Sequence, residues 1–358
     1  MLMKLKGVNL LRNKKWIGVI IAGLFVWIGC TQTYQVSIDD LPDTDPYYTT
    51  GYPITDISDQ IEEVQQSLIR ISSTARYRVY LIDDRLQITA EQADTLDPAE
   101  IAISQTAIEE STAGTAIVIG KTSSRAYMLT CAHTVEFPDR VYSYLVGENI
   151  EPNTYVRTIA VKQSQVNMAL TENTLALYSL EDEDRVNDLA LISINLDNFD
   201  QIEEDLNPID LKMGYSENLK SGSLVYVMGF PRGYQTVTRG IVTLANRDDS
   251  GGFLTDALFN RGISGGIILA SKDNFRSFDW VGMANAGVAN REYFLVPESD
   301  QIDYDLPYQQ YSGDIMAREI STLNYGLTHT ISTQKIREFL DQNRRALRNL
   351  GRSYQLSK

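Results

Sequence analysis

The stretch NRGISGG, residues 260–266, sets Ser264 among Gly262, Gly265 and Gly266. Clusters of glycine and serine usually mark turns, so this motif alone predicts only a turn. A serine hydroxyl becomes a useful nucleophile when a neighbouring base, most often histidine, takes its proton. The histidines and carboxylates of the rest of the chain therefore decide what Ser264 does.

The sequence has 2 histidines. His133 ends the apolar run YMLTCAHTV, and His329 lies in YGLTHTIS. Asp188 begins the apolar segment DLALISI, where a carboxylate is costly unless it is paired. Each residue alone is more typical of a structural role. Together, His133, Asp188 and Ser264 follow the chain order of a chymotrypsin-type triad, in which aspartate orients the histidine that activates the serine.

Short apolar runs rich in β-branched residues surround these positions and are separated by Gly, Asn, Asp and Ser. This pattern predicts an all-β barrel or sandwich. Examples are YRVYLI, GTAIVIG, AYMLTCA, DLALISI, GSLVYVMGF, TVTRGIVTL, GGIILA and WVGMANAGVA. Near the end, residues 332–351 carry apolar side chains at helical spacing, which predicts a helix with Thr333 as its N-cap.

Several of these segments together resemble the HtrA/Deg branch of trypsin-like serine proteases, over roughly residues 65–345. LTCAHTV is similar to the Thr-Ala-Ala-His strand of that branch, and NDLALISI to its Asp-Leu-Ala-Leu strand. GSLVYVMGFPRGYQTVTRGIVT is similar to its Gly-x-x-Val-x-Ala-Ile-Gly-x-Pro segment and the following Thr-x-Gly-Ile-Val. TDALFNRGISGG resembles Thr-Asp-Ala-x-x-Asn-x-Gly-Asn-Ser-Gly-Gly.

The resemblance implies an all-β fold of two six-stranded barrels with a C-terminal α-helix. Residues 61–200 would form the first barrel, with His133 and Asp188, and residues 201–358 the second, with Ser264. It also implies a serine endopeptidase that acts on proteins or peptides and needs no metal or cofactor. The N–H groups of Gly262 and Ser264 would form the oxyanion hole. Asn285 stands where the family has a serine that hydrogen-bonds the triad aspartate.

The sequence also departs from the family pattern. Ile263 precedes the serine where the branch has asparagine, and Arg261 stands in place of a proline. No PDZ-like sequence follows the terminal helix, so we expect no regulation through PDZ peptide binding. Two functions stay open: an active peptidase, or an inactive trypsin-like domain that serves as a surface binding or scaffold module.

The expected substrate pocket is apolar and of limited depth. Alignment on Ser264 places Leu258 at the floor of the pocket, and Asn285, Ala286 and Gly287 along one wall. An unpaired basic side chain would be costly to bury there, so we expect cleavage after small or medium apolar residues. Residues 290–324 form an acidic, tyrosine-containing insertion that we interpret as either a surface loop or a docking surface beside the cleft.

The N-terminus has the layout of an export signal. Basic residues within positions 4–15 precede the uncharged apolar run 16–29, which is followed by Cys30. Cys30 would be lipidated if residues 1–29 are a lipoprotein signal, and the alternative is an uncleaved membrane anchor. Residues 30–60 would form a flexible tether, so the protein would lie in the bacterial cell envelope, on the periplasmic or surface side. With Cys30 lipidated, Cys131 has no disulfide partner.

Composition fits a globular protein, with 43% hydrophobic and 22% charged residues. The formal net charge of -15 argues against nucleic acid as a partner.

Overall fold

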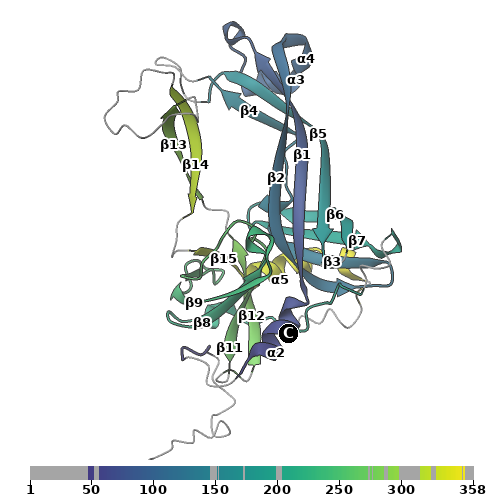
Figure 1. The fold of residues 1–358 in the computed structure, drawn as a ribbon, viewed down its shortest axis with the longest axis vertical. Helices are drawn as coiled ribbons and strands as arrows, with labels where there is room; N and C mark the ends of the chain where they lie inside the picture. The colour runs from purple at the N-terminus through teal and green to yellow at the C-terminus, as the bar shows by residue number, and fades with distance from the viewer. Residues whose placement is uncertain are drawn as a thin grey trace, which may run out of the picture. The chain divides into compact units, whose positions relative to one another are not determined.

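Two antiparallel β-barrels contain most of the strands of the protein (Figure 1). The structure is a computed structural model that describes residues 47–51, 56–145, 151, 153–171, 174–198, 204–272, 275, 277–285, 289–297, 315–323, 328–348 and 350. For 289–297 and 315–323 it describes the backbone alone. The fold predicted from the sequence, two six-stranded barrels followed by a helix, is confirmed.

The first barrel closes because β1 pairs with both β2 and β5. Around the barrel the order is β1-β2-β3-β7-β6-β5, and β4 adds to the outer side of β5. Its strands are β1 (Leu68–Ile82), β2 (Ala102–Lys121), β3 (Arg125–Thr130), β4 (Arg140–Tyr144), β5 (Val156–Leu170), β6 (Leu175–Asp184) and β7 (Leu189–Asn195).

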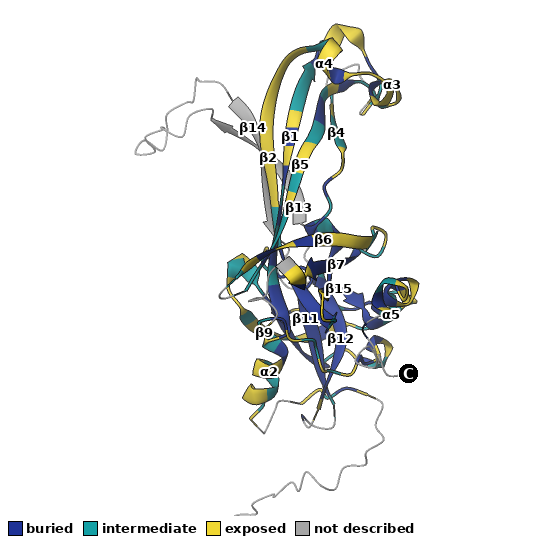
Figure 2. Cartoon of the chain, turned by 90° about the vertical axis from the view of Figure 1, so that its right-hand side faces the viewer, coloured by how far each residue is buried: buried dark blue, intermediate teal, exposed yellow. Residues whose placement is uncertain are grey.

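Strands β1, β2 and β5 run well beyond this barrel as an arm, and β4 pairs with the far part of β5 as its fourth strand. The β1–β2 pairing continues from Leu68 opposite Ile117 to Ile82 opposite Ala102, whereas β2 pairs with β3 only from Ile117 onward. The far end carries the short helices η2 (Asp84–Leu86), α3 (Ala90–Thr95) and α4 (Pro98–Ile101). Its own apolar cluster consists of Ile82, Ile88, Ala93, Val156 and Ile159. Figure 2 shows that β2 is exposed along the arm, whereas β1 and β5 alternate between buried, intermediate and exposed residues there.

The second barrel is closed in the order β10-β15-β12-β11-β8-β9. Its strands are β8 (Leu224–Gly229), β9 (Thr236–Leu244), β10 (Leu254–Thr255), β11 (Ile267–Lys272), β12 (Ser277–Asn285) and β15 (Thr328–Ser332). Between β12 and β15, inside the expected insertion, β13 (Ala289–Pro297) and β14 (Ile315–Leu323) form an antiparallel hairpin. The residues that join these two strands lie outside the described ranges.

Helices flank the barrels at both ends of the described chain. Helix α2 (Ser58–Gln65) precedes β1, and α5 (Thr333–Gln342) follows β15. The N-cap of α5 is Ser332, whose hydroxyl accepts a hydrogen bond from the Lys335 amide, and the prediction of Thr333 is wrong by one residue. The helix ends at Gln342, yet Leu347 and Leu350 beyond it are still buried.

Part of the expected tether, residues 30–60, packs against the second barrel. The Thr49 amide donates to the Ser271 carbonyl at 2.9 Å, and the Thr49 carbonyl accepts from the Leu224 amide at 3.0 Å. Tyr48 is buried, and its hydroxyl donates to the Asp279 carboxylate. Burial raises the pKa of Tyr48. The expectation of a flexible segment is therefore wrong for residues 47–49, because a large aromatic side chain and two backbone hydrogen bonds fix them.

Three apolar clusters form the main cores. One fills the first barrel and one fills the second. The largest joins the barrels, because it contains residues from both, such as Leu129 and Leu189 from the first and Ile267 and Trp280 from the second. Phe339 of α5 packs into this shared cluster. The helix therefore stabilises the packing of one barrel on the other.

We predict that Phe339→Ala lowers the free energy of unfolding by about 3–5 kcal/mol, because it leaves a cavity in the shared cluster. Urea denaturation measures this change. Glu338→Ala, at the exposed neighbouring position, is the control and should change stability by less than about 0.5 kcal/mol. Equal effects of both substitutions would mean that α5 does not support the fold in this way.

Candidate functional site

His133 lies in a short 3-10 helix, η3 (Ala132–Thr134), directly after β3. Its backbone amide donates to Oδ1 of Asp188 at 2.9 Å, and its ring Nδ1 lies 2.7 Å from Oδ2 of the same carboxylate. Since an ionised carboxylate only accepts hydrogen bonds, Nδ1 carries the proton of the neutral ring and Nε2 is left as an acceptor. Asp188 therefore sets both the position and the tautomer of His133.

Asp188 has a left-handed backbone conformation, with φ of 57°, in the turn before β7. Aspartate tolerates this conformation better than most residues, although it is still strained. The Asp188 carbonyl accepts from the Ala132 amide at 3.3 Å, so the backbone and the side chain both contact η3. The turn directs the carboxylate toward His133.

Ser264 lies in the turn that leads into β11, and its hydroxyl is 3.0 Å from Nε2 of His133. Backbone hydrogen bonds hold this turn from both barrels. The Ser264 carbonyl accepts from the Thr115 amide of the first barrel at 2.8 Å, and the Gly265 amide donates to the Ala284 carbonyl of the second at 2.9 Å. Gly265 has φ of 85°, and a Cβ there would lie 2.0 Å from the Thr115 carbonyl oxygen. Only glycine fits this close approach. The three residues predicted as a triad are thus brought into one hydrogen-bonded chain.

Two backbone N–H groups beside Ser264 have no acceptor among the described residues, those of Gly262 and of Ser264 itself. Each of these N–H groups shares a peptide bond with the carbonyl of the preceding residue. The Arg261 carbonyl accepts a hydrogen bond from the Arg232 amide, and the Ile263 carbonyl accepts one from the Gly266 amide, both at 2.8 Å. Because C=O and N–H point in opposite directions in a trans peptide, both free N–H groups are oriented by these contacts. They are suited to stabilise a negatively charged oxygen.

Ile263, which replaces a family asparagine, is only 1% exposed and packs in the core of the second barrel with Val227, Ala257 and Phe259. The turn before Ser264 is therefore anchored by apolar packing. Ser264 itself is 4% exposed, and the His133 side chain 37%.

Thr115 of β2 is a further residue of the site that the sequence analysis missed. Its buried hydroxyl donates to the Gly262 carbonyl and accepts from the Phe230 amide, both at 2.9 Å. Together with its amide, it contacts the Ser264 turn twice from the other barrel. The sequence feature that could have indicated this role is a hydroxyl side chain within the apolar segment GTAIVIG, since a buried hydroxyl needs a hydrogen-bond partner.

The structure describes Leu258 and Asn285 of the expected substrate pocket. Leu258 is 56% exposed, whereas its neighbours Ala257 and Phe259 are buried in the second barrel. The assignment of Leu258 to the base of the substrate pocket stays a prediction. Asn285 ends β12 opposite His329 of β15. Ala286 and Gly287 lie outside the described residues, as do Cys30 and the whole of the expected signal segment 1–29.

Cys131 lies directly behind the Asp188–His133 pair and is fully buried, with its thiol donating to the Ala284 carbonyl at 3.4 Å. Burial, and secondarily the Asp188 charge, raise the pKa of this thiol. No disulfide includes it. Within the described part of the chain, no helix is both long and apolar enough to cross a membrane.

We predict that Thr115→Val lowers the free energy of unfolding by about 2 kcal/mol, because the Gly262 carbonyl and the Phe230 amide lose a buried partner while the side-chain shape is kept. Thr106→Val, on the exposed arm, is the control. Urea denaturation of both variants measures the difference. A Thr115→Val protein as stable as the control would show that these contacts contribute little.

Comparison with known proteins agrees with the geometry. Residues 114–275 match the family model of a trypsin-like peptidase domain. The chain is also 39% identical over 100 residues to Protease Do-like 8, chloroplastic, of Arabidopsis thaliana. That alignment covers 25% of this chain and 21% of the relative, so it spans about a fifth of the length of the Arabidopsis protein. The two barrels described above form a trypsin-like fold, and residues 114–275 are similar to a trypsin-like peptidase domain.

Proposed function

We propose that the protein is a serine endopeptidase in which Ser264, His133 and Asp188 act as the catalytic triad. The observation that carries the proposal is the hydrogen-bonded chain from Asp188 through His133 to Ser264, beside two free backbone N–H groups. Both barrels contribute to this chain, and it requires no metal or cofactor.

The geometry supports acyl transfer in two stages. The Ser264 hydroxyl attacks the carbonyl carbon of the scissile peptide bond while Nε2 of His133 takes its proton. Asp188 keeps the ring oriented and stabilises the imidazolium that forms. The imidazolium then gives its proton to the leaving amine, and a water molecule repeats the sequence to release the acyl group.

The N–H groups of Gly262 and Ser264 stabilise the oxyanion of each tetrahedral intermediate. A donor of this kind commonly contributes about 3 kcal/mol to transition-state stabilisation. The Thr115 hydroxyl positions them indirectly, because it holds the carbonyl of Gly262. In place of a hydrogen-bonding side chain before the serine, Ile263 fixes the turn through the core.

We predict that Ser264→Ala and His133→Ala each reduce peptide hydrolysis by at least about 10⁴-fold, since triad residues act as a unit. His329→Ala is the matched control. Its ring lies on β15 and contacts Arg247, not Asp188 or Ser264, so most activity should remain.

A fluorophosphonate probe tests the same assignment independently of any substrate. Wild type should be labelled at Ser264, and the label should be absent from the Ser264→Ala variant. A folded wild-type protein that takes no label would support the alternative function, an inactive binding or scaffold module. Labelling that depends on His329 rather than His133 would overturn the choice of base.

We also propose that the peptidase acts outside the cytoplasmic membrane on protein or peptide substrates, attached through its N-terminal segment. The basic residues before the apolar run 16–29 and the cysteine that follows support this location. Nucleic acid is not a proposed partner, given the net charge of -15.

We predict that cells expressing the full chain incorporate labelled palmitate into it, and that Cys30→Ala abolishes this incorporation. The physical reason is that only a cysteine placed directly after the signal would be lipidated. Cys131→Ala is the control, because the Cys131 thiol is fully buried. Membrane attachment that survives Cys30→Ala without any palmitate would favour the uncleaved anchor.

A further inference from the structure

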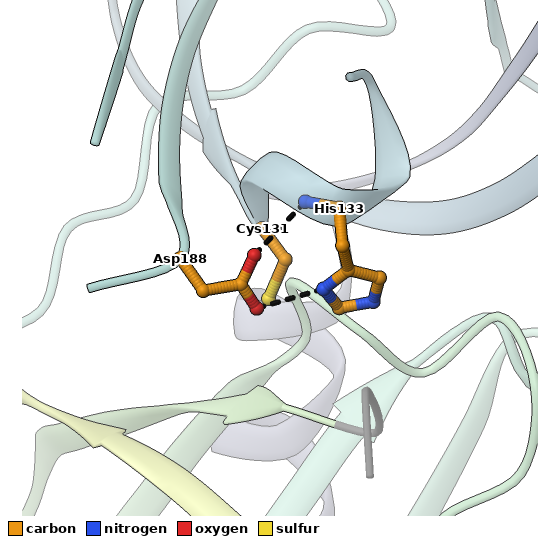
Figure 3. A group of neighbouring side chains, drawn as sticks. All are labelled: Cys131, His133 and Asp188. Atoms are coloured by element: carbon orange, nitrogen blue, oxygen red, sulfur yellow. Dashed lines mark hydrogen bonds and ion pairs between the residues drawn. The ribbon is translucent and has the colours of Figure 1, made fainter. Parts of the chain in front are cut away.

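Cys131, His133 and Asp188 form a cluster whose thiol has no part in the proposed catalysis (Figure 3). The Cys131 sulfur, a ring nitrogen of His133 and a carboxylate oxygen of Asp188 all lie within 4.8 Å of one another. The cluster joins two segments, since Cys131 and His133 follow β3 and Asp188 precedes β7.

This donor set matches the ligands of a zinc-class cation. Thiolate, imidazole and carboxylate bind Zn²⁺ at about 2.0–2.3 Å in tetrahedral sites, which places ligand atoms about 3.4–3.8 Å apart. The three donor atoms lie within 4.8 Å of one another, so shifts of the side chains would be needed to reach these separations. Nδ1 of His133 and Oδ2 of Asp188 are hydrogen-bonded at 2.7 Å. They would need to move about 1 Å further apart to act as two ligands of one cation. Three protein ligands leave a fourth position for water.

We propose that these three side chains bind a zinc-class divalent cation that switches the triad off. The thiol of Cys131 loses its proton to solvent when the cation binds. The ring of His133 stays neutral, with its proton moved from Nδ1 to Nε2. One thiolate and one carboxylate then balance the two positive charges, so the buried site carries no net charge.

The switch acts through the tautomer of His133. With the cation on Nδ1 and a proton on Nε2, the ring cannot accept the Ser264 proton, and Asp188 no longer orients the ring for catalysis. This consequence rests on the proposed function, whereas the binding of the cation does not. Because burial raises the pKa of the Cys131 thiol, the cation must displace a tightly held proton, and we expect a chelator to reverse binding.

Cadmium tests the binding without any measurement of activity. The full chain is prepared with Cys30→Ser, so that Cys131 is its single thiol. Titration with Cd²⁺ should produce a thiolate-to-metal charge-transfer band in the ultraviolet that saturates at one cation per chain. The band should persist in Ser264→Ala and be lost in Cys131→Ala. A Cys30→Ser protein with no band would overturn the proposal.

Inhibition by Zn²⁺ tests the consequence. Each variant is compared with its own rate after chelator treatment, so that changes in basal activity cancel. Cys131→Ala, and Cys131→Ser as a second variant with closer shape, should raise the half-inhibiting Zn²⁺ concentration at least about tenfold. His329→Ala should leave it unchanged. Equal inhibition of wild type and both Cys131 variants would place the inhibitory cation elsewhere and overturn the proposal.

The two proposals fail in different ways. A charge-transfer band in a protein that neither hydrolyses peptides nor takes the fluorophosphonate label would keep the cation site and remove the peptidase function. An active peptidase that shows no charge-transfer band would keep the peptidase function and remove the cation site.

Discussion

The hydrogen bond from the Thr115 amide to the Ser264 carbonyl links the first barrel to the turn that carries the serine of the second. His133 and Asp188 belong to the first barrel, so the 3.0 Å contact between His133 and Ser264 exists only when the barrels are packed together. The shared apolar cluster, which includes Trp280 and Phe339, packs buried side chains of both barrels together. The geometry of the site is thus a property of the whole domain, because neither barrel contains it alone.

The sequence was most informative where function and local pattern coincide. The order of His133, Asp188 and Ser264, each beside an apolar strand, was sufficient to predict the chain of hydrogen bonds. The arm as a whole was not predicted, although its segment YRVYLI was expected to be a strand. Residues 102–111 of β2 bury neither face, since even Ile103 and Ile108 are exposed, and such a strand has no alternation to detect. Tyr48 was missed for another reason: a single buried aromatic residue within a Pro- and Asp-rich segment has no periodicity.

Two residues from different barrels, Ile263 and Thr115, together order the turn before Ser264. A hydrogen-bonding side chain at position 263 would need a partner within the turn, whereas Ile263 needs only a complementary core. The polar contacts come instead from Thr115, on a different barrel, which ties the Gly262 carbonyl to the Phe230 amide. A substitution that looks unfavourable in a motif is therefore compatible with an ordered site, and motif comparison alone could not reveal the compensation.

Strand β2 has one further consequence along the arm. From Ala102 to Glu110 it pairs with β1 on one side, and no described strand pairs with its other side, so its outward amide and carbonyl groups face solvent. An open sheet edge of this kind can recruit other chains and nucleate aggregation. Glu109 and Glu110 lie on this edge strand, and the Glu109 carboxylate forms a salt bridge with Arg76 of β1. A charged side chain on an edge strand opposes its pairing with another strand, and Glu110 places such a charge on the open edge of the arm.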